Sequence, residues 1–140
     1  MRQNFYRNYM ESEVLNADPV KLVCLLYRGA IERVRDARQC LRKQDIPGRA
    51  KAISRALAII NELMLSVDRQ QGGEIAARLI ELYDYVARCL NDANFRQVDG
   101  PLAEVEQLLT TLASAWEECV PSTRGAAGAD VLYAPVSCAG

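Results

Sequence analysis

The chain has 140 residues and a net charge of −1; half of its residues are apolar and a quarter are charged, which is the composition of one folded domain. Histidine is absent, which excludes a Ser-His-Asp catalytic unit, a histidine-ligated zinc or haem, and a Glu-x-x-His di-iron bundle. The longest apolar run, Leu22 to Tyr27, is too short to cross a bilayer, and the first twenty residues contain no signal-peptide core. We therefore expect a cytoplasmic protein with no membrane insertion, whose five widely spaced cysteines are reduced thiols.

Turn-forming residues divide the chain into a short leading arm, four long segments and a tail. Asp18-Pro19 predicts a helix start, and the separators between segments are Asp45 to Gly48, Gln71 to Gly73 and Asp99 to Pro101, with Pro121 closing the fourth. Short linkers favour antiparallel neighbours. The sequence predicts an all-α protein, an antiparallel up-down four-helix bundle over residues 18–120, with an N-terminal arm (1–17) and a flexible C-terminal tail (121–140).

Each long segment repeats apolar residues every three or four positions, which is typical of helices that face a core. The residues expected to face inward are Val23, Tyr27, Ala30, Val34, Ala37 and Leu41; Ile46, Ala50, Ile53, Leu57, Ile60, Met64 and Val67; Ile75, Leu79, Leu82, Val86, Leu90 and Ala93; and Val98, Leu102, Val105, Leu109, Leu112 and Trp116.

Three segments carry a second apolar stripe beside the inward one. Exposed contiguous apolar area usually marks a partner site, and small residues within it leave grooves that accept a partner helix. A thick core or a homodimer interface remains an alternative explanation. The second stripes are Leu22, Leu25, Leu26 and Gly29; Ala52, Ala56, Ile59 and Leu63; and Ala76, Ile80, Tyr83 and Ala87. In the arm, Tyr6 and Tyr9 are aromatic residues in a polar stretch, so we expect them to dock either on the partner groove or on the bundle.

Charge is segregated along the chain, with +7 over residues 20–55 and −7 over residues 56–140. Lys21, Arg28, Arg35 and Arg42 recur every seven residues, so they line one helix face that could meet phosphates. No aromatic residues interleave that face, so we expect no nucleic-acid partner. The carboxylates have neither a nucleophile nor a base arranged with them, which predicts no enzymatic activity, no cofactor and no metal site.

Several motifs resemble the flagellar secretion chaperone family FliS in their order and spacing, over roughly residues 4–118. Arg28 stands where members of that family usually have Asp. The motifs are Leu26-Tyr27-Arg28-Gly29-Ala30, Val67-Asp68, Gly72-Gly73-Glu74-Ile75-Ala76, Leu82-Tyr83-Asp84-Tyr85-Val86, Ala93-Asn94 and Trp116. We add Tyr27 and Asn94, which lie in these motifs, to the candidate partner-binding residues.

The resemblance implies a function for the second stripes. Proteins of this family hold the disordered C-terminal segment of flagellin in the cytosol, prevent its premature polymerisation and help to deliver it to the type III export gate. A segment that folds on binding needs a large contact surface to offset its ordering entropy. Without the resemblance, the same residues fit a helical adaptor or dimerisation module for another amphipathic partner, and they leave open whether the chain is a monomer or a homodimer.

Overall fold

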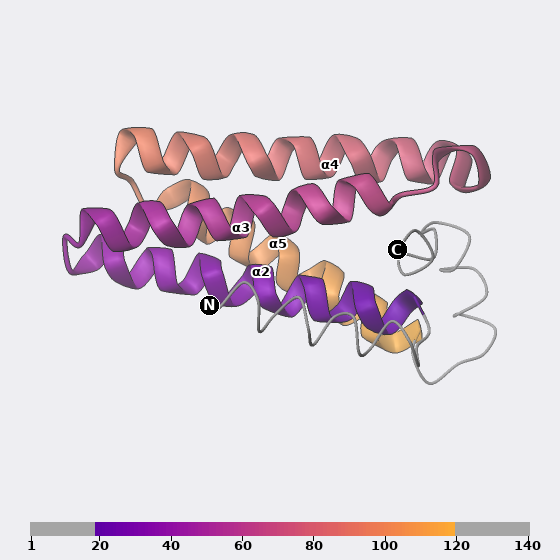
Figure 1. Cartoon of the computed structure of the whole chain (residues 1–140), viewed down its shortest axis with the longest axis horizontal. Coiled ribbons are helices and arrows are strands. Elements are labelled where there is room, and N and C mark those ends of the chain that lie inside the picture. The colour runs from indigo at the N-terminus through magenta and orange to yellow at the C-terminus, as the bar shows by residue number, and fades with distance from the viewer. Residues whose placement is uncertain (1–18, 120–140) are drawn as a thin grey trace.

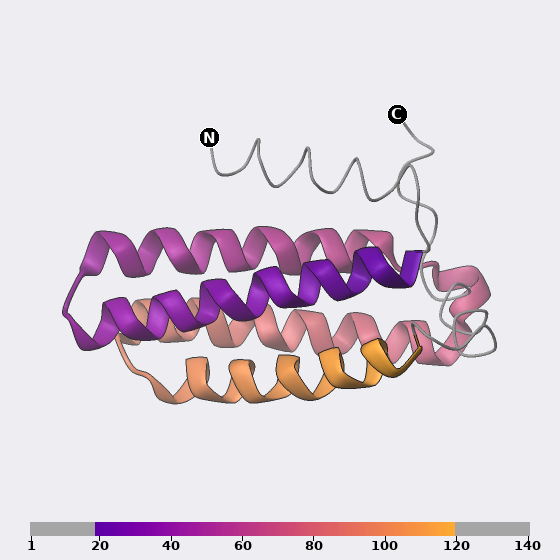
Figure 2. The same ribbon diagram turned by 90° about the horizontal axis from the view of Figure 1, so that it is seen from below.

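The computed structural model describes residues 19–119, which form four α-helices. The predicted arm and tail, with Tyr6 and Tyr9, lie outside these residues. Consecutive helices run antiparallel and pack side by side, and the last returns against the first, so that α2 lies diagonally across the bundle from α4 (Figures 1 and 2). The helices are α2 (Pro19–Arg42), α3 (Ile46–Ser66), α4 (Arg69–Arg96) and α5 (Gly100–Cys119). The predicted all-α up-down bundle is confirmed.

Aspartate caps begin two of the helices. The Asp45 carboxylate accepts a hydrogen bond from the Gly48 backbone N–H at 3.0 Å. The helix α3 starts at Ile46, directly after Asp45, and has Pro47 in its first turn. The Asp68 carboxylate accepts the N–H groups of Gln70 and Gln71, both at 3.1 Å, at the start of α4. These caps satisfy backbone donors that a helix start otherwise leaves unpaired.

The boundary between α3 and α4 differs from the sequence expectation. Gln71 to Gly73 was expected to separate these helices, but α3 already ends at Ser66 and α4 begins at Arg69. Gly73 instead lies inside α4 with φ of 58° and ψ of −132°, where it kinks the helix after its first turn. The capping carboxylate of Asp68 explains the early start, because it stabilises one helical turn before the glycine interrupts it.

The core explains why three segments carry two apolar stripes. On α3, Ala56 and Leu63 from the second stripe are fully buried, whereas Leu57 and Met64 from the expected inward stripe are half-buried. Each helix of this four-helix bundle packs against two neighbouring helices. It therefore buries a wide part of its circumference, which includes parts of both stripes. Ile46 and Ile75 correct the inward assignment further. They are 53% and 64% exposed: Ile46 is the first residue of α3, and Ile75 follows the kink at Gly73, where its neighbour Ala76 is the buried residue.

Ion pairs join the basic α2 to the acidic α5. Arg38 donates to both oxygens of Asp99, at 2.8 and 2.9 Å, and to Glu106 at 3.0 Å. Arg35 also donates to Glu106 at 3.0 Å, and Arg28 pairs with Glu117 at 3.4 Å. Two cations of the predicted basic stripe are therefore neutralised by α5, which accounts for part of the charge segregation seen in the sequence.

Candidate partner-binding site

Most of the predicted partner-binding residues lie where α2 packs against α3, a surface that we call the α2–α3 face. These two helices make the most extensive contact of any pair in the bundle. Because they run antiparallel, the start of α2 lies beside the end of α3, and the face has two halves of different composition. The apolar half comprises Leu22, Leu25, Leu26 and Gly29 of α2 with Ala56, Ile59 and Leu63 of α3. The basic half surrounds a pocket. Its lining is Arg33, Asp36, Gln39 and Cys40 of α2, Lys43 and Asp45 of the turn, and Gly48, Lys51, Ala52 and Arg55 of α3.

In the apolar half, only two predicted residues are partly accessible. Leu25 and Ile59 are half-buried, whereas the other five residues of this half are buried. Leu26, Ala56 and Leu63 belong to the buried core cluster. Gly29 is also buried. The expectation that Gly29 and Ala56 shape a groove for a partner helix stays a prediction.

Tyr27 and Tyr83 meet inside the core. Their hydroxyl oxygens are 2.6 Å apart and form a buried hydrogen bond, and their ring centroids lie 6.3 Å apart with an interplanar angle of 50°. Both side chains are fully buried. The pair connects α2 with α4 across the diagonal of the bundle, so the structure brings together two predicted site residues that are 56 positions apart.

On α4, the predicted residues Ile80 and Asn94 are both half-buried. The Asn94 side-chain oxygen accepts a hydrogen bond from Arg49 Nε at 3.0 Å, and its backbone oxygen accepts from Arg49 Nη2 at 3.4 Å. Arg49 is a buried charged residue that the sequence reasoning missed. Its spacing of four residues before Ile53 is the signal that places it on the inward face of α3.

Sequence reasoning also missed large apolar side chains that are exposed outside the predicted stripes. Phe95 on α4 is 88% exposed, and Leu65 near the end of α3 is 73% exposed. Tyr85 on α4 is less exposed, at 38%. Its hydroxyl donates to Glu104 of α5, a contact that raises the pKa of Tyr85 because it favours the protonated phenol. Phe95 lies near the end of α4 and Leu65 near the end of the antiparallel α3, so they lie at opposite ends of the bundle. Single exposed hydrophobic residues are normal on soluble proteins.

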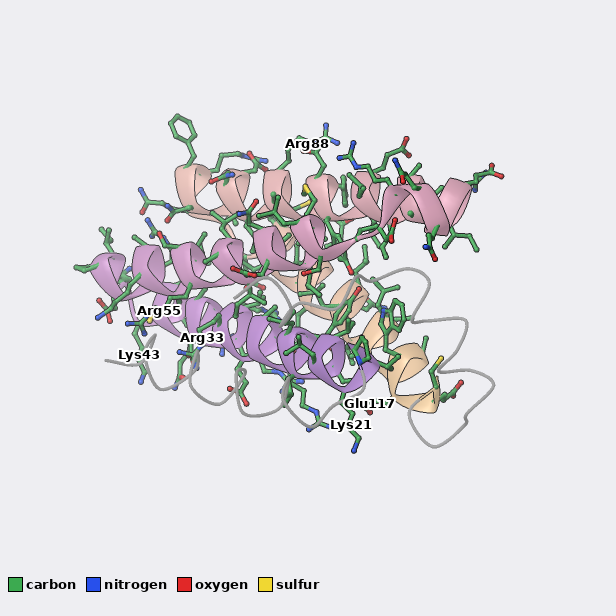
Figure 3. The ribbon with its side chains drawn as sticks, turned by 45° about the vertical axis from the view of Figure 1, so that its right-hand side comes forward. Lys21, Arg33, Lys43, Arg55, Arg88 and Glu117 are labelled. Atoms are coloured by element: carbon green, nitrogen blue, oxygen red, sulfur yellow. The ribbon has the colours of Figure 1, made fainter. Side chains whose placement is uncertain are left out.

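The basic half is hollowed into a pocket of about 360 Å³. Figure 3 shows Arg33, Lys43 and Arg55 gathered where the end of α2 meets the start of α3. Arg33 pairs with Asp36 at 3.3 Å and lies 3.8 Å from Glu32. Over residues 19–119, Lys43, Lys51 and Arg55 make no ion pair. The pocket therefore presents positive charge that the fold does not neutralise.

The floor of this pocket is tightly packed. A Cβ atom on Gly48 would lie 2.3 Å from Asp45 Oδ2 and 2.9 Å from Cys40 Sγ, so a larger residue there would force these two side chains to shift. Burial raises the pKa of the Cys40 thiol, and the nearby Asp45 carboxylate raises it further. Cys40 is consequently a protonated, weakly nucleophilic thiol in this pocket.

Among the residues that the structure describes, no group of three or more His, Cys, Asp or Glu side chains is arranged to hold a metal ion. None of the four helices is both long and apolar enough to span a membrane.

Comparison with known proteins gives a consistent match. The family model described as "Flagellar protein FliS" matches residues 2–123. The chain is 41% identical over 113 residues to the flagellar secretion chaperone FliS of Salmonella typhimurium, which covers 80% of this chain and 84% of that protein. It is 35% identical over 108 residues to the flagellar secretion chaperone FliSB of Pseudomonas aeruginosa (77% and 86% covered). It is 34% identical over 122 residues to the flagellar secretion chaperone FliS of Bacillus subtilis (87% and 90% covered).

Proposed function

The chain belongs to the FliS family of flagellar secretion chaperones, and from that premise we propose that it binds the C-terminal segment of flagellin in the cytoplasm. Binding covers the segment's apolar face, prevents premature polymerisation, and assists delivery of flagellin to the type III export apparatus. Chaperones are not a class of enzyme, so the proposed activity is binding and release of a client without a chemical step.

The observation that carries this proposal is the pair of half-buried residues on the apolar half, Leu25 and Ile59. Both lie at the edge of the buried core, so an amphipathic helix laid along α2 and α3 covers them and extends the core outward. Burying additional apolar area is favourable by about 25 cal/mol per Å², which offsets the cost of ordering the client. The fully buried members of the predicted set support this surface from below.

The proposal extends to two further groups of predicted residues. Ile80 and Asn94 are half-buried on α4, so a client that wraps from α3 onto α4 meets them next. Tyr6 and Tyr9 lie outside the described residues, and we propose that their aromatic rings contact the same client. Tyr6→Ala and Tyr9→Ala, each titrated separately with the client peptide, test this part: unchanged affinity and unchanged heat for both would remove the arm from recognition.

Calorimetric titration of the full chain with a peptide of the cognate flagellin C-terminal segment tests the function. Ile59→Glu places a charge where the client helix packs, so we expect at least about a tenfold loss of affinity. Ala58→Glu is the matched control, because it adds the same charge at the adjacent exposed position, and we expect less than about a twofold change.

Two outcomes separate the function from the site. If the unmodified chain does not bind the cognate flagellin segment, the proposed function is wrong. If it binds but Ile59→Glu and Ala58→Glu behave alike, the function stands and the apolar half is not where the client lies. Circular dichroism of both variants shows whether the helical fold is kept.

A further inference from the structure

We propose that the basic half of the α2–α3 face is a second binding site, which takes an acidic peptide segment of a partner protein. Carboxylates of that segment pair with Lys43, Lys51 and Arg55, three cations that line the pocket without an ion-pair partner among the described residues. The site shares no residue with the apolar half, although Ala52 of the predicted second stripe lines it.

The first support is the contrast between the cations of α2 that face α5 and the cations around the pocket. Arg28, Arg35 and Arg38 of α2 each find a carboxylate on α5. Around the pocket, four cationic side chains face only two carboxylates, a net charge of +2. Of these carboxylates, Asp36 pairs with Arg33, while Asp45 accepts the Gly48 backbone N–H. The remaining positive charge is therefore available to an external acid.

The second support is the length of the cationic surface. Arg33 lies on α2 and Lys43 lies in the turn that follows it, ten residues further along, which corresponds to about 15 Å at the rise of a helix. Lys51 and Arg55 are one turn apart on α3, about 6 Å. At about 3.3 Å per residue of an extended peptide, the longer span matches four or five residues and the shorter span about two. A segment with three or more carboxylates within that length would meet cations on both walls of the pocket.

The chemistry of the lining favours an acidic peptide over a nucleic acid. Asp36 and Asp45 stand among the cations, and their carboxylate oxygens can accept backbone N–H groups of a peptide, which a sugar–phosphate backbone lacks. The pocket lining contains no aromatic side chain on which a base could stack. The start of α3 adds no free N–H donor at Gly48, because the Asp45 carboxylate already occupies it.

Fluorescence anisotropy of a labelled deca-glutamate peptide, titrated with the full chain at low ionic strength, tests the proposal. Deca-glutamine is the neutral comparison peptide, and inorganic polyphosphate and single-stranded RNA are competitors. The test variant is Lys51→Gln/Arg55→Gln. The matched control is Lys21→Gln/Arg69→Gln, which removes the same charge from exposed positions away from the pocket.

We expect deca-glutamate to bind and deca-glutamine not to bind, with at least about a tenfold loss of affinity in the test variant and less than about a twofold loss in the control. Equal losses in the two variants would show a general charge effect and overturn the site. Binding of both peptides alike would also overturn it. If RNA or polyphosphate competes more strongly than unlabelled deca-glutamate and loses its affinity in the test variant alone, the pocket is an anion site for phosphates and the peptide assignment is wrong.

Discussion

Along the α2–α3 face, the start of α2 and the end of α3 bury their apolar side chains against each other, whereas the other ends of the same helices hold cations around an open pocket. Both halves belong to one pair of antiparallel helices. In the apolar half, Leu26, Ala56 and Leu63 belong to the core cluster that holds the bundle together, and Leu25 and Ile59 are the partly accessible residues. In the basic half, Lys43, Lys51 and Arg55 form no ion pair within residues 19–119, so their charges are available to bind a partner.

The largest expected difference between the halves is in stability. Leu63→Ala removes a fully buried side chain from the apolar half, so we expect it to lower the free energy of unfolding by about 2–5 kcal/mol. Leu65→Ala, two residues further along α3, removes an exposed side chain and should change it by less than about 0.5 kcal/mol. Urea unfolding followed by circular dichroism measures both. Similar midpoints would mean that Leu63 does not support the core.

Within the basic half, one backbone position is structural. Gly48→Ala forces the new Cβ atom against the Asp45 carboxylate, which disturbs the cap of α3, so we expect a loss of about 1–2 kcal/mol. Gly100→Ala is the control, because no neighbouring atom lies within 4 Å of a Cβ built there. Thermal unfolding measures both variants. Equal stability of Gly48→Ala and Gly100→Ala would contradict the close packing of Gly48 against Asp45.

Cations that are paired should make stability depend on pH. Hydrogen bonds from Arg38 lower the pKa of Asp99; burial alone would raise the pKa of Glu106, but hydrogen bonds from Arg35 and Arg38 outweigh burial and lower it. Groups with a lowered folded-state pKa contribute stability above their unfolded pKa, about 4, and lose that contribution as the pH falls through the folded pKa.

We therefore expect Arg38→Gln to be less stable than the unmodified chain at neutral pH, and this difference to shrink as the pH falls from about 5 to 2. Urea unfolding over a pH series measures the difference. Lys51→Gln, which removes an unpaired cation, is the comparison and should show no such dependence. A constant difference for Arg38→Gln at all pH values would argue against the ion pairs with α5.

The smallest expected effect concerns the binding variant of the basic half. Lys51→Gln/Arg55→Gln should change the free energy of unfolding by no more than about 0.5 kcal/mol, because neither cation is paired within residues 19–119. Thermal melts of this variant and the unmodified chain provide the measurement. A large loss of stability would show that Lys51 and Arg55 stabilise the fold. It would contradict the distinction between a structural apolar half and a basic half that is available for binding.

Helix periodicity was enough to predict the bundle, because apolar spacing and turn residues are local signals. The boundary between α3 and α4 was not predictable in the same way. Glycines at 72 and 73 signal an ending, but the competing cap at Asp68 starts a helix before them, and only the folded backbone shows that both signals are used.

The candidate site was harder to predict than the fold. Two apolar stripes on α3 show that the helix has broad apolar contact, but they do not say whether the second contact is another helix or a partner. The structure resolves this for Ala56 and Leu63, which pack inside the bundle. The pocket could not be foreseen, because its walls come from both sides of the turn between α2 and α3, and pairing of α2 cations with α5 is a long-range property.

The buried hydroxyl contact between Tyr27 and Tyr83 has a consequence for how this sequence can change over evolution. Replacing one tyrosine with phenylalanine removes this buried hydrogen bond and costs about 1–3 kcal/mol, whereas the second replacement finds the bond already gone and costs less than the first. A lineage that has lost one of these hydroxyls therefore meets a smaller penalty for losing the other. Substitutions at these positions, 56 residues apart, are therefore expected to occur in pairs across descendants of this chain.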